Sequence, residues 1–120
     1  MPLRVYYGDI HNHSGISYGH GPLEDALANA RQQLDFCSVT GHAHWPDMPN
    51  EPGRLDGLVQ YHLDGFAKLA ANWPTVLDTM NDANEPGSFV TYPSFEWHSN
   101  RSGDHAIYYR DGAGDLLRPD

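Results

Sequence analysis

The sequence predicts a single α/β domain, and three observations support this. A strand pattern from Arg4 to Ile10 is followed by an amphipathic helix and then by a short apolar strand, Phe36 to Thr40. With the later segments, the expected order is β-α-β-α-α-β-β, which is typical of the α/β class. Histidines and one glutamate fall directly after these strands, where α/β sheets collect their functional side chains.

The first expected strand ends in a pair of histidines. It leads into Gly8-Asp9-Ile10-His11-Asn12-His13, and alternate side chains of a strand share one face. Asp9, His11 and His13 are therefore expected together at the C-terminal end of the strand. Neutral imidazole is the commonest metal ligand in proteins, so a metal site is the first hypothesis. The alternative is that both histidines are simply solvated.

The next segment predicts a βαβ unit. After a loop rich in glycine and serine, Pro22 opens a helix whose first turn carries acids. Apolar residues recur in it at helical spacing, at Leu23, Ala26, Leu27, Ala30 and Leu34. The strand from Phe36 to Thr40 is short and apolar, as expected for a strand buried on both faces. Cys37, the only cysteine, is interpreted as a small buried residue rather than a nucleophile.

Two helices are expected in the middle of the chain. A long loop from Gly41 to Gly53 precedes a helix from Leu55 to Asn72, which has one apolar face. Pro74 is expected to stop this helix, and Thr75 to cap a shorter one that ends near Asn84.

Two strands are expected near the C-terminus. Ser88 to Glu96 has the pattern of a third strand, with Pro93 weakening its later half, and His105 to Arg110 has that of a fourth. No internal repeat or linker interrupts the pattern, so residues 1–120 are expected to form one domain.

Composition argues against several classes of protein. The net charge of −9 argues against binding to nucleic acid or to anionic membranes, because both need a basic surface. No apolar run is long enough to span a membrane, and the first residues lack a signal-peptide pattern, which favours a cytoplasmic protein. An anionic substrate stays compatible with this charge, because bound cations can dominate the field of a site. Eight histidines are an unusual number for 120 residues.

Four short motifs in order carry a resemblance to a known family. They are Gly8 to Ser14, Ser38 to His42, Phe95 to Trp97, and Gly103 to His105. Together they resemble the first motifs of the polymerase and histidinol phosphatase (PHP) superfamily, and in particular an uncharacterised branch of PHP-like proteins known as DUF3604. The resemblance implies about the first half of a distorted, TIM-like (β/α)7 barrel. It also implies two or three divalent metal ions and hydrolytic, often phosphoesterase, activity on a small-molecule substrate.

The resemblance also implies a set of metal ligands. By position, His11 and His13 would bind one metal, and Glu96 would bridge two, since each carboxylate oxygen can serve a different cation. His42 and His105 match further ligands, and we assign the catalytic role to Glu96 and His42. Ligation by histidine and carboxylate together suits Zn, Mn or Fe.

The sequence departs from the family pattern at two places. Gly41 stands where the family usually has an aspartate before the histidine of its second motif. The usual Ser-Asp-Gly after the first motif is replaced by a loop from Gly15 to Gly21. His20 in this loop is our substitute ligand, and the alternative is a loop histidine exposed to water.

Five further residues are weaker candidates. His44 could face the cavity or lie in a solvated loop, and His98 could contact substrate or lie on the surface. Asp9 could accept an imidazole N–H and fix its tautomer, or be a simple strand-end carboxylate. Arg101 is the one arginine near the site in sequence, and arginine favours phosphate recognition. His62 lies in the apolar stripe of a helix and is expected to be structural.

The expected elements do not complete a barrel. A closed barrel of this type usually needs about 250 residues, and the family's later ligands, a histidine and an Asp-x-His pair, have no counterpart here. A fragment that lacks a C-terminal half is the favoured interpretation. The alternatives are completion by a partner, such as a second copy in a homo-oligomer, and a truncated relative.

Three functions are compatible with the sequence. The first is a metal-dependent phosphoesterase, and the second is a metallohydrolase of another bond, such as C–N. The third is a non-catalytic metal-binding fragment.

Overall fold

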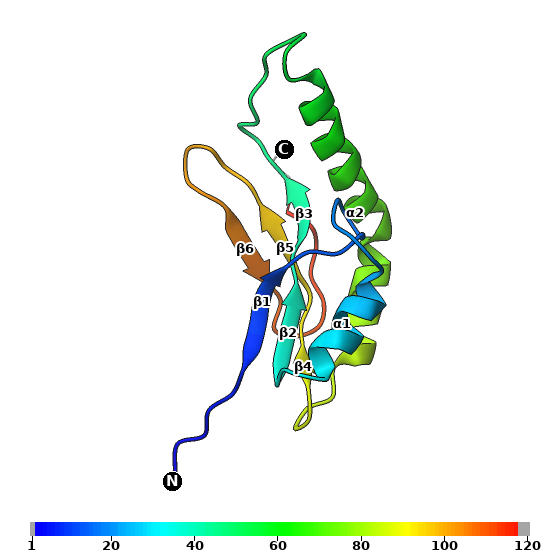
Figure 1. Ribbon diagram of the computed structural model, residues 1–120, viewed down its shortest axis with the longest axis vertical. Helices are drawn as coiled ribbons and strands as arrows, with labels where there is room; N and C mark the ends of the chain where they lie inside the picture. Colours follow the sequence, from blue (N-terminus) through cyan, green and yellow to red (C-terminus); the bar gives the residue numbers. More distant parts are fainter. Residues whose placement is uncertain (1, 118–120) are drawn as a thin grey trace.

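Two small sheets and two helices make up the part of the chain that the structure describes. The structure is a computed structural model that describes residues 2–117 (Figure 1). Its elements in chain order are β1 (Gly8–Asn12), α1 (Leu23–Arg31), β2 (Phe36–Val39), β3 (Gly41–His44), α2 (Asp56–Ala83), β4 (Val90–Thr91), β5 (Ser94–Trp97) and β6 (His105–Tyr108).

Each sheet has three strands. The first has the order β1-β2-β4, and all its neighbours are parallel. The second has the order β3-β5-β6, in which β3 and β5 are parallel and β5 and β6 antiparallel. Thr40 alone separates β2 from β3, and only Tyr92 and Pro93 separate β4 from β5. Two segments of chain therefore run side by side from one sheet into the other.

The expectation of half a barrel is wrong. A barrel of that type needs one continuous sheet of parallel strands joined by helical crossovers. Here the pairing is interrupted at Thr40 and at Pro93, which has no N–H to donate. The last strand also returns directly through residues 98–104 and pairs antiparallel, as a hairpin does. No closed barrel exists within residues 2–117.

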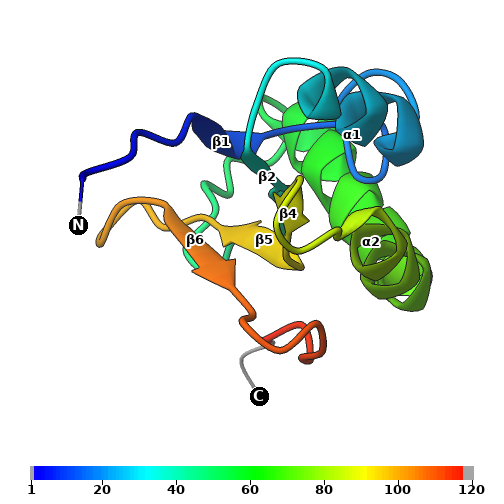
Figure 2. The same ribbon diagram turned by 90° about the horizontal axis from the view of Figure 1, so that it is seen from below.

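Both helices lie on one side of the strands (Figure 2). Helix α1 follows Pro22 and has Glu24 and Asp25 in its first turn, where the partial positive charge favours acids. Burial of large apolar side chains, at roughly 1.5–3 kcal/mol each, holds these layers together. The buried core consists of Leu23, Leu27, Cys37, Val39, Leu69, Trp73, Val76, Met80, Phe89 and Phe95. Cys37 is buried, as predicted.

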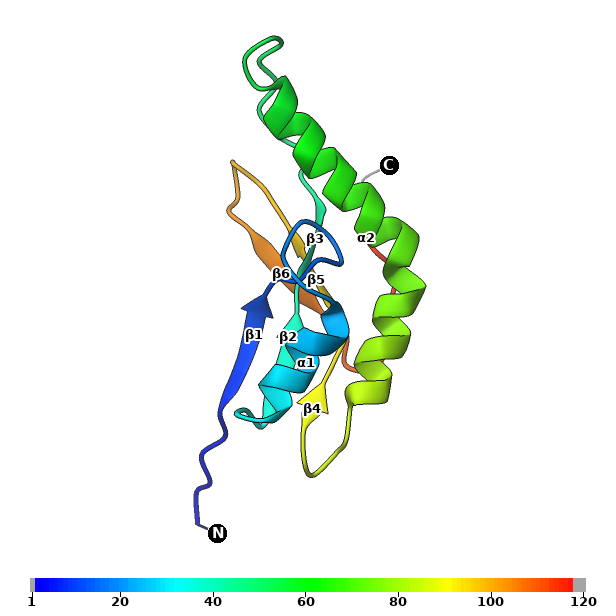
Figure 3. The ribbon, with the colours of Figure 1, turned by 45° about the vertical axis from the view of Figure 1, so that its right-hand side comes forward.

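Helix α2 continues through the proline that was expected to stop it. Its bounds are Asp56–Ala83, with Pro74 inside, so the prediction of two helices is wrong. A proline costs one hydrogen bond and crowds the preceding turn, which produces a bend rather than a break where packing compensates. The neighbouring Trp73 and Val76 are both buried in the core, and the helix bends in its middle (Figure 3).

Strand boundaries also differ from the prediction. The first strand begins at Gly8 rather than Arg4, and the fourth ends at Tyr108 rather than Arg110. Strand β3 lies inside the segment that was expected to be a loop. Within residues 2–117, neither helix is long and apolar enough to cross a membrane.

Candidate metal centre

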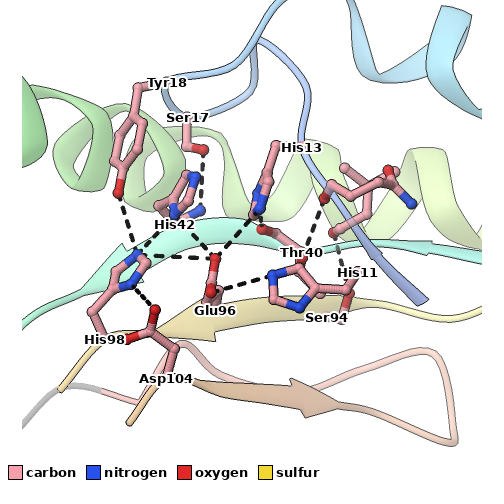
Figure 4. A network of polar contacts seen from close by, with 12 residues as sticks. His11, His13, Ser17, Tyr18, Thr40, His42, Ser94, Glu96, His98 and Asp104 are labelled. Carbon is pink, nitrogen blue, oxygen red and sulfur yellow. Dashed lines mark hydrogen bonds and ion pairs between the residues drawn. The ribbon is translucent and has the colours of Figure 1, made fainter. Parts of the chain in front are cut away.

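Glu96 lies at the centre of a group of histidines. Its Oε1 is 3.2 Å from His11 Nε2, and its Oε2 is 3.5 Å from His13 Nε2. The same Oε2 is 3.1 Å from His42 Nδ1 and 4.0 Å from His98 Nε2. One carboxylate thus faces four imidazoles that come from three separate parts of the chain (Figure 4).

Strand geometry brings these side chains together. His42 of β3 and Glu96 of β5 are register partners in a parallel pair, so their side chains project from the same face. His98 lies two residues after Glu96, and His11 and His13 lie at and just after the end of β1. The cluster therefore forms at the end of β1, at the start of β3 and at the end of β5.

The ligand atoms form two groups that share one residue. His11, His13 and Glu96 have one ligand atom each within 4.8 Å of one another, and we call them the outer group. His42, Glu96 and His98 meet the same criterion, and we call them the inner group. Either group could hold a metal ion, and Glu96 could contribute to both.

The chemistry of the cluster fits a cation. Glu96 Oε2 is buried, yet no group in residues 2–117 makes a hydrogen bond to it with acceptable geometry. A buried carboxylate oxygen without a hydrogen-bond donor is costly in water-free surroundings unless a positive charge compensates it. Imidazole nitrogens with a carboxylate oxygen are the donor set that transition metals such as zinc, iron and manganese accept.

One hydrogen bond and one ion-pair contact orient the imidazoles. His13 Nδ1 is 2.9 Å from the carbonyl oxygen of Thr40, which can only accept, so Nδ1 carries the proton. His98 Nδ1 is 3.1 Å from Asp104 Oδ2, and a carboxylate has the same effect. In both residues the Nε2 lone pair is left to face Glu96. Such supporting acceptors are usual behind metal-binding histidines.

The electrostatics keep Glu96 ionised. Its burial raises the pKa, but the His42 side chain and then the charges of His98 and His11 lower the pKa to about 2. The pKa of His13 is lowered, first by burial and then by the neighbouring His42. An anionic carboxylate beside neutral imidazole is the protonation state that metal binding requires.

The two groups differ in exposure. The side chains of His11 and His13 are 51% and 31% exposed, whereas those of His42 and His98 are 12% and 11% exposed. A ligand from solution therefore has access to the outer group first.

Tyr18 covers the inner group. Its ring stacks on the His42 imidazole, with centroids 3.8 Å apart, and its Oη is 3.2 Å from His98 Nε2. Burial and then Glu96 raise the pKa of Tyr18, so its hydroxyl stays protonated at neutral pH. Gly65 of α2 makes room for the ring, because a Cβ on Gly65 would lie 2.1 Å from Tyr18 Cδ1. No spacing or composition signal in the sequence pointed to Tyr18.

Two predicted ligands lie outside both groups. His105 is exposed and pairs with Trp97, whereas Glu96 pairs with Ala106. Since successive side chains of a strand alternate, His105 projects from the face opposite Glu96. His20 is exposed at the far end of its loop, and the same loop directs Tyr18 towards the cluster instead.

The weaker candidates also take other positions. A register shift between His42 and His44 makes Trp97 the strand partner of His44, and the His44 ring lies 6.4 Å from that of Phe66. Asp9 Oδ1 accepts a hydrogen bond from the backbone N–H of His11 rather than from an imidazole. Arg101 is exposed, and its backbone N–H donates to Asp47.

His98 is more central than the sequence indicated. We expected a substrate contact or a surface residue, and the structure places His98 among the ligand atoms of the inner group. Its spacing from Glu96, two residues along a strand, was a usable signal. Asp104, which orients His98, lay inside the fourth motif but was not singled out.

Neither a scan against protein-family models nor a search of curated proteins gave a match to this chain.

Proposed function

We propose that this protein is a metal-dependent hydrolase, most closely a phosphoesterase, related to the PHP-like metallohydrolases. The observation that carries the proposal is the convergence of four histidines on the single buried carboxylate of Glu96. His11, His13, His42 and Glu96 are four of the five motif residues that the family resemblance implied as ligands, and the fifth, His105, lies outside both groups. We propose Zn, Mn or Fe as the ion and two ions as the number, one in each group.

Each residue of the cluster has a defined task in this proposal. Thr40 and Asp104 fix the imidazoles of His13 and His98 with Nε2 towards the ions. Glu96 would contribute to both groups, since its Oε1 lies 3.2 Å from His11 Nε2 and its Oε2 lies 3.1 Å from His42 Nδ1. Cations held there would supply hydroxide near neutral pH from a coordinated water and stabilise charge developing on the substrate.

In this proposal the substrate binds at the outer group, because its histidines are the more exposed to solvent. The exposed faces of His11 and His13 leave room for a substrate oxygen and a water, which a catalytic site needs. The inner group is covered by Tyr18 and lies close to the ring of Trp45, 5.6 Å from that of His98. Its residues exclude water and hold the bridging carboxylate in place.

The family's missing aspartate has a packing reason. A Cβ on Gly41 would lie 2.8 Å from Leu69 Cδ1, so a larger residue would require the buried Leu69 side chain to shift. In the proposed centre, Asp104 and Thr40 supply the supporting acceptors instead.

Hydrolysis of a C–N bond is the second candidate. In residues 2–117, no arginine or lysine side chain forms an ion pair with the cluster. Phosphate recognition usually recruits such cations, whereas an amide does not need them.

The test is hydrolysis by the purified chain loaded separately with zinc, manganese and iron. Candidate substrates are a p-nitrophenyl phosphate monoester, its diester and a p-nitroanilide, assayed with and without a chelator. We expect phosphate-ester cleavage that is lost with chelator and in His13→Ala, and retained in the surface variant Glu51→Gln. Cleavage of the anilide alone would select the C–N candidate. Metal binding with no hydrolysis of any substrate would leave a non-catalytic metal-binding protein.

A further inference from the structure

Asp47 makes an unusual number of hydrogen bonds for an exposed residue. It lies in the loop between β3 and α2, and its carboxylate accepts from Ser99 Oγ at 3.0 Å, Asn100 N at 2.9 Å and Arg101 N at 2.8 Å. Its main-chain oxygen also accepts from Asn100 Nδ2 at 3.0 Å. An exposed aspartate is normally solvated and mobile, so four contacts to one neighbouring loop indicate a fixed junction.

The loop that Asp47 holds is the one that carries Asp104. Within it, Ser102 N donates to Ser99 Oγ at 3.0 Å, and Gly103 N donates to Ser99 O at 2.9 Å. Asp104 Oδ1 accepts from Ser99 N at 3.2 Å, and its Oδ2 lies 3.1 Å from His98 Nδ1. Ser99 therefore connects Asp47 to Asp104 through hydrogen bonds on both sides.

The connection ends at a ligand atom of the inner group. While Nδ1 of His98 lies 3.1 Å from Asp104 Oδ2, its Nε2 lies 2.7 Å from His42 Nδ1 and 4.0 Å from Glu96 Oε2. His98 also has its backbone fixed, because its N–H donates to His44 O at 2.8 Å. Tyr18 and His42 contact the Nε2 side of the ring, and Asp104 contacts its Nδ1 side. The position of Asp104 in turn depends on the loop.

We infer that Asp47 is a positioning residue for the metal centre: through Ser99 and Asp104 it sets the tautomer and direction of His98. The inference rests on the proposed metal centre and not on the hydrolysis assigned to it. It also explains why the outer group needs no such junction, since His13 is oriented directly by the backbone of Thr40.

The charge on Asp47 agrees with this arrangement. Desolvation raises the pKa of Asp47, but the hydrogen bonds from Asn100 and Arg101 lower the pKa overall. The carboxylate that accepts those bonds is therefore ionised at neutral pH.

The experiment compares Asp47→Asn with Glu51→Gln. Both variants remove one charge from the same loop, but Glu51 contacts only Arg54 in the ion pairs of the structure. The first readout is the His98 tautomer in metal-free protein, from ¹⁵N-edited NMR with the signals assigned through His98→Gln. The second is titration with cobalt, in which the two groups are expected to bind in separable steps.

We expect Asp47→Asn to lower the Nδ1–H population of His98 and to weaken the inner binding step by about tenfold, with the outer step unchanged. Glu51→Gln should change neither. An unchanged tautomer and an unchanged inner step in a folded Asp47→Asn protein would overturn the inference. Equal weakening of both steps would do the same, because it would indicate a general loss of structure.

A milder variant covers the case in which Asp47→Asn unfolds. Ser99→Ala removes only a hydroxyl, and it should shift the tautomer and the inner step in the same direction by a smaller factor. No effect of Ser99→Ala in that case would overturn the inference. If the wild-type chain binds no cobalt, the metal centre fails and the role of Asp47 in it fails as well. If it binds cobalt in two steps but hydrolyses nothing, only the proposed hydrolysis fails, and the inner step and the tautomer still decide the role of Asp47.

Discussion

The outer and inner groups share Glu96 but are held in different ways. The outer histidines come from one end of β1, an edge strand whose residues are mostly exposed. The inner histidines lie on β3 and just after β5, beneath Tyr18, and one of them is fixed by the loop that Asp47 holds. The inner group is preorganised by packing, whereas the outer group is open to solvent. In the proposed metal centre, this difference would separate the task of holding an ion from the task of admitting a substrate.

The largest effect is expected from removing what the two groups share. Glu96→Gln keeps the size of the side chain but removes its charge, so both groups lose their one anionic ligand. Metal affinity should fall by more than the roughly 100-fold that loss of a supporting residue costs. Metal content after dialysis measures this. The control is Glu85→Gln, which removes a surface carboxylate paired with Arg31; equal metal content in the two variants would refute the shared role of Glu96.

The next variants separate the groups. His98→Ala should remove the inner ion and His11→Ala the outer ion, so each protein should keep about half of the wild-type metal, since each loses one of three ligands to one ion. Cobalt absorption should change differently in the two proteins because the remaining ions have different surroundings. His20→Ala and His105→Ala should keep all the metal. Loss of metal from either of these would restore the ligand set that the sequence implied.

A third variant tests the packing over the inner group alone. Gly65→Ala places a methyl group where Tyr18 Cδ1 lies, so we expect a loss of roughly 1–3 kcal/mol in unfolding free energy. The inner binding step should weaken and the outer step should not. Gly57→Ala in the same helix is the matched control, because nothing lies within 4 Å of its added Cβ. Urea denaturation and cobalt titration give the two readouts, and equal stability of the two variants would contradict the close contact.

The smallest expected effect is on the stability of the metal-free protein, which should fall with decreasing pH in two separate pH ranges. His13 has a pKa below its ordinary 6.5, so the unfolded chain takes up that proton first and stability falls as pH drops through 6.5. Glu96 has a pKa of about 2 against an ordinary 4.5, so its contribution is present above pH 4.5 and is lost between 4.5 and about 2. Urea midpoints across this range measure both. Glu96→Gln should abolish the lower window, and a lower window that persists in this variant would assign it to another carboxylate.

The sequence alone could predict which candidate metal ligands meet where the direction and alternation of strands determine the positions of their side chains. His11, His13, His42 and Glu96 follow or end patterned strands, and parallel strands bring their C-terminal ends together. Their convergence therefore needed no knowledge of loops. His98 was within reach of the same argument, because it shares the parity of Glu96.

Register and long-range packing were beyond that argument. His105 was misplaced because the hairpin register sets its face, and that register is not encoded in the spacing of the residues. A register shift likewise sets the strand partner of His44, for which the sequence left a site role and a solvated loop both open. Strand β3, Gly-His-Ala-His, has little strand propensity and forms because β5 lies beside it. Tyr18 lies over the cluster because Gly65, which is far away in the sequence, leaves room for its ring. Helix α2 continues past Pro74 because the residues beside that proline, Trp73 and Val76, are buried in the core.

The single carboxylate at Glu96 also has a mechanical consequence. Strands β1 and β5 belong to different sheets and share no backbone ladder. An ion bound by His11, His13 and Glu96 would cross-link the two strands. It would thereby hold the exposed strand β1 against the rest of the domain. Stripping the ion should then let that strand fray first, with its amide protons exchanging before those of β2.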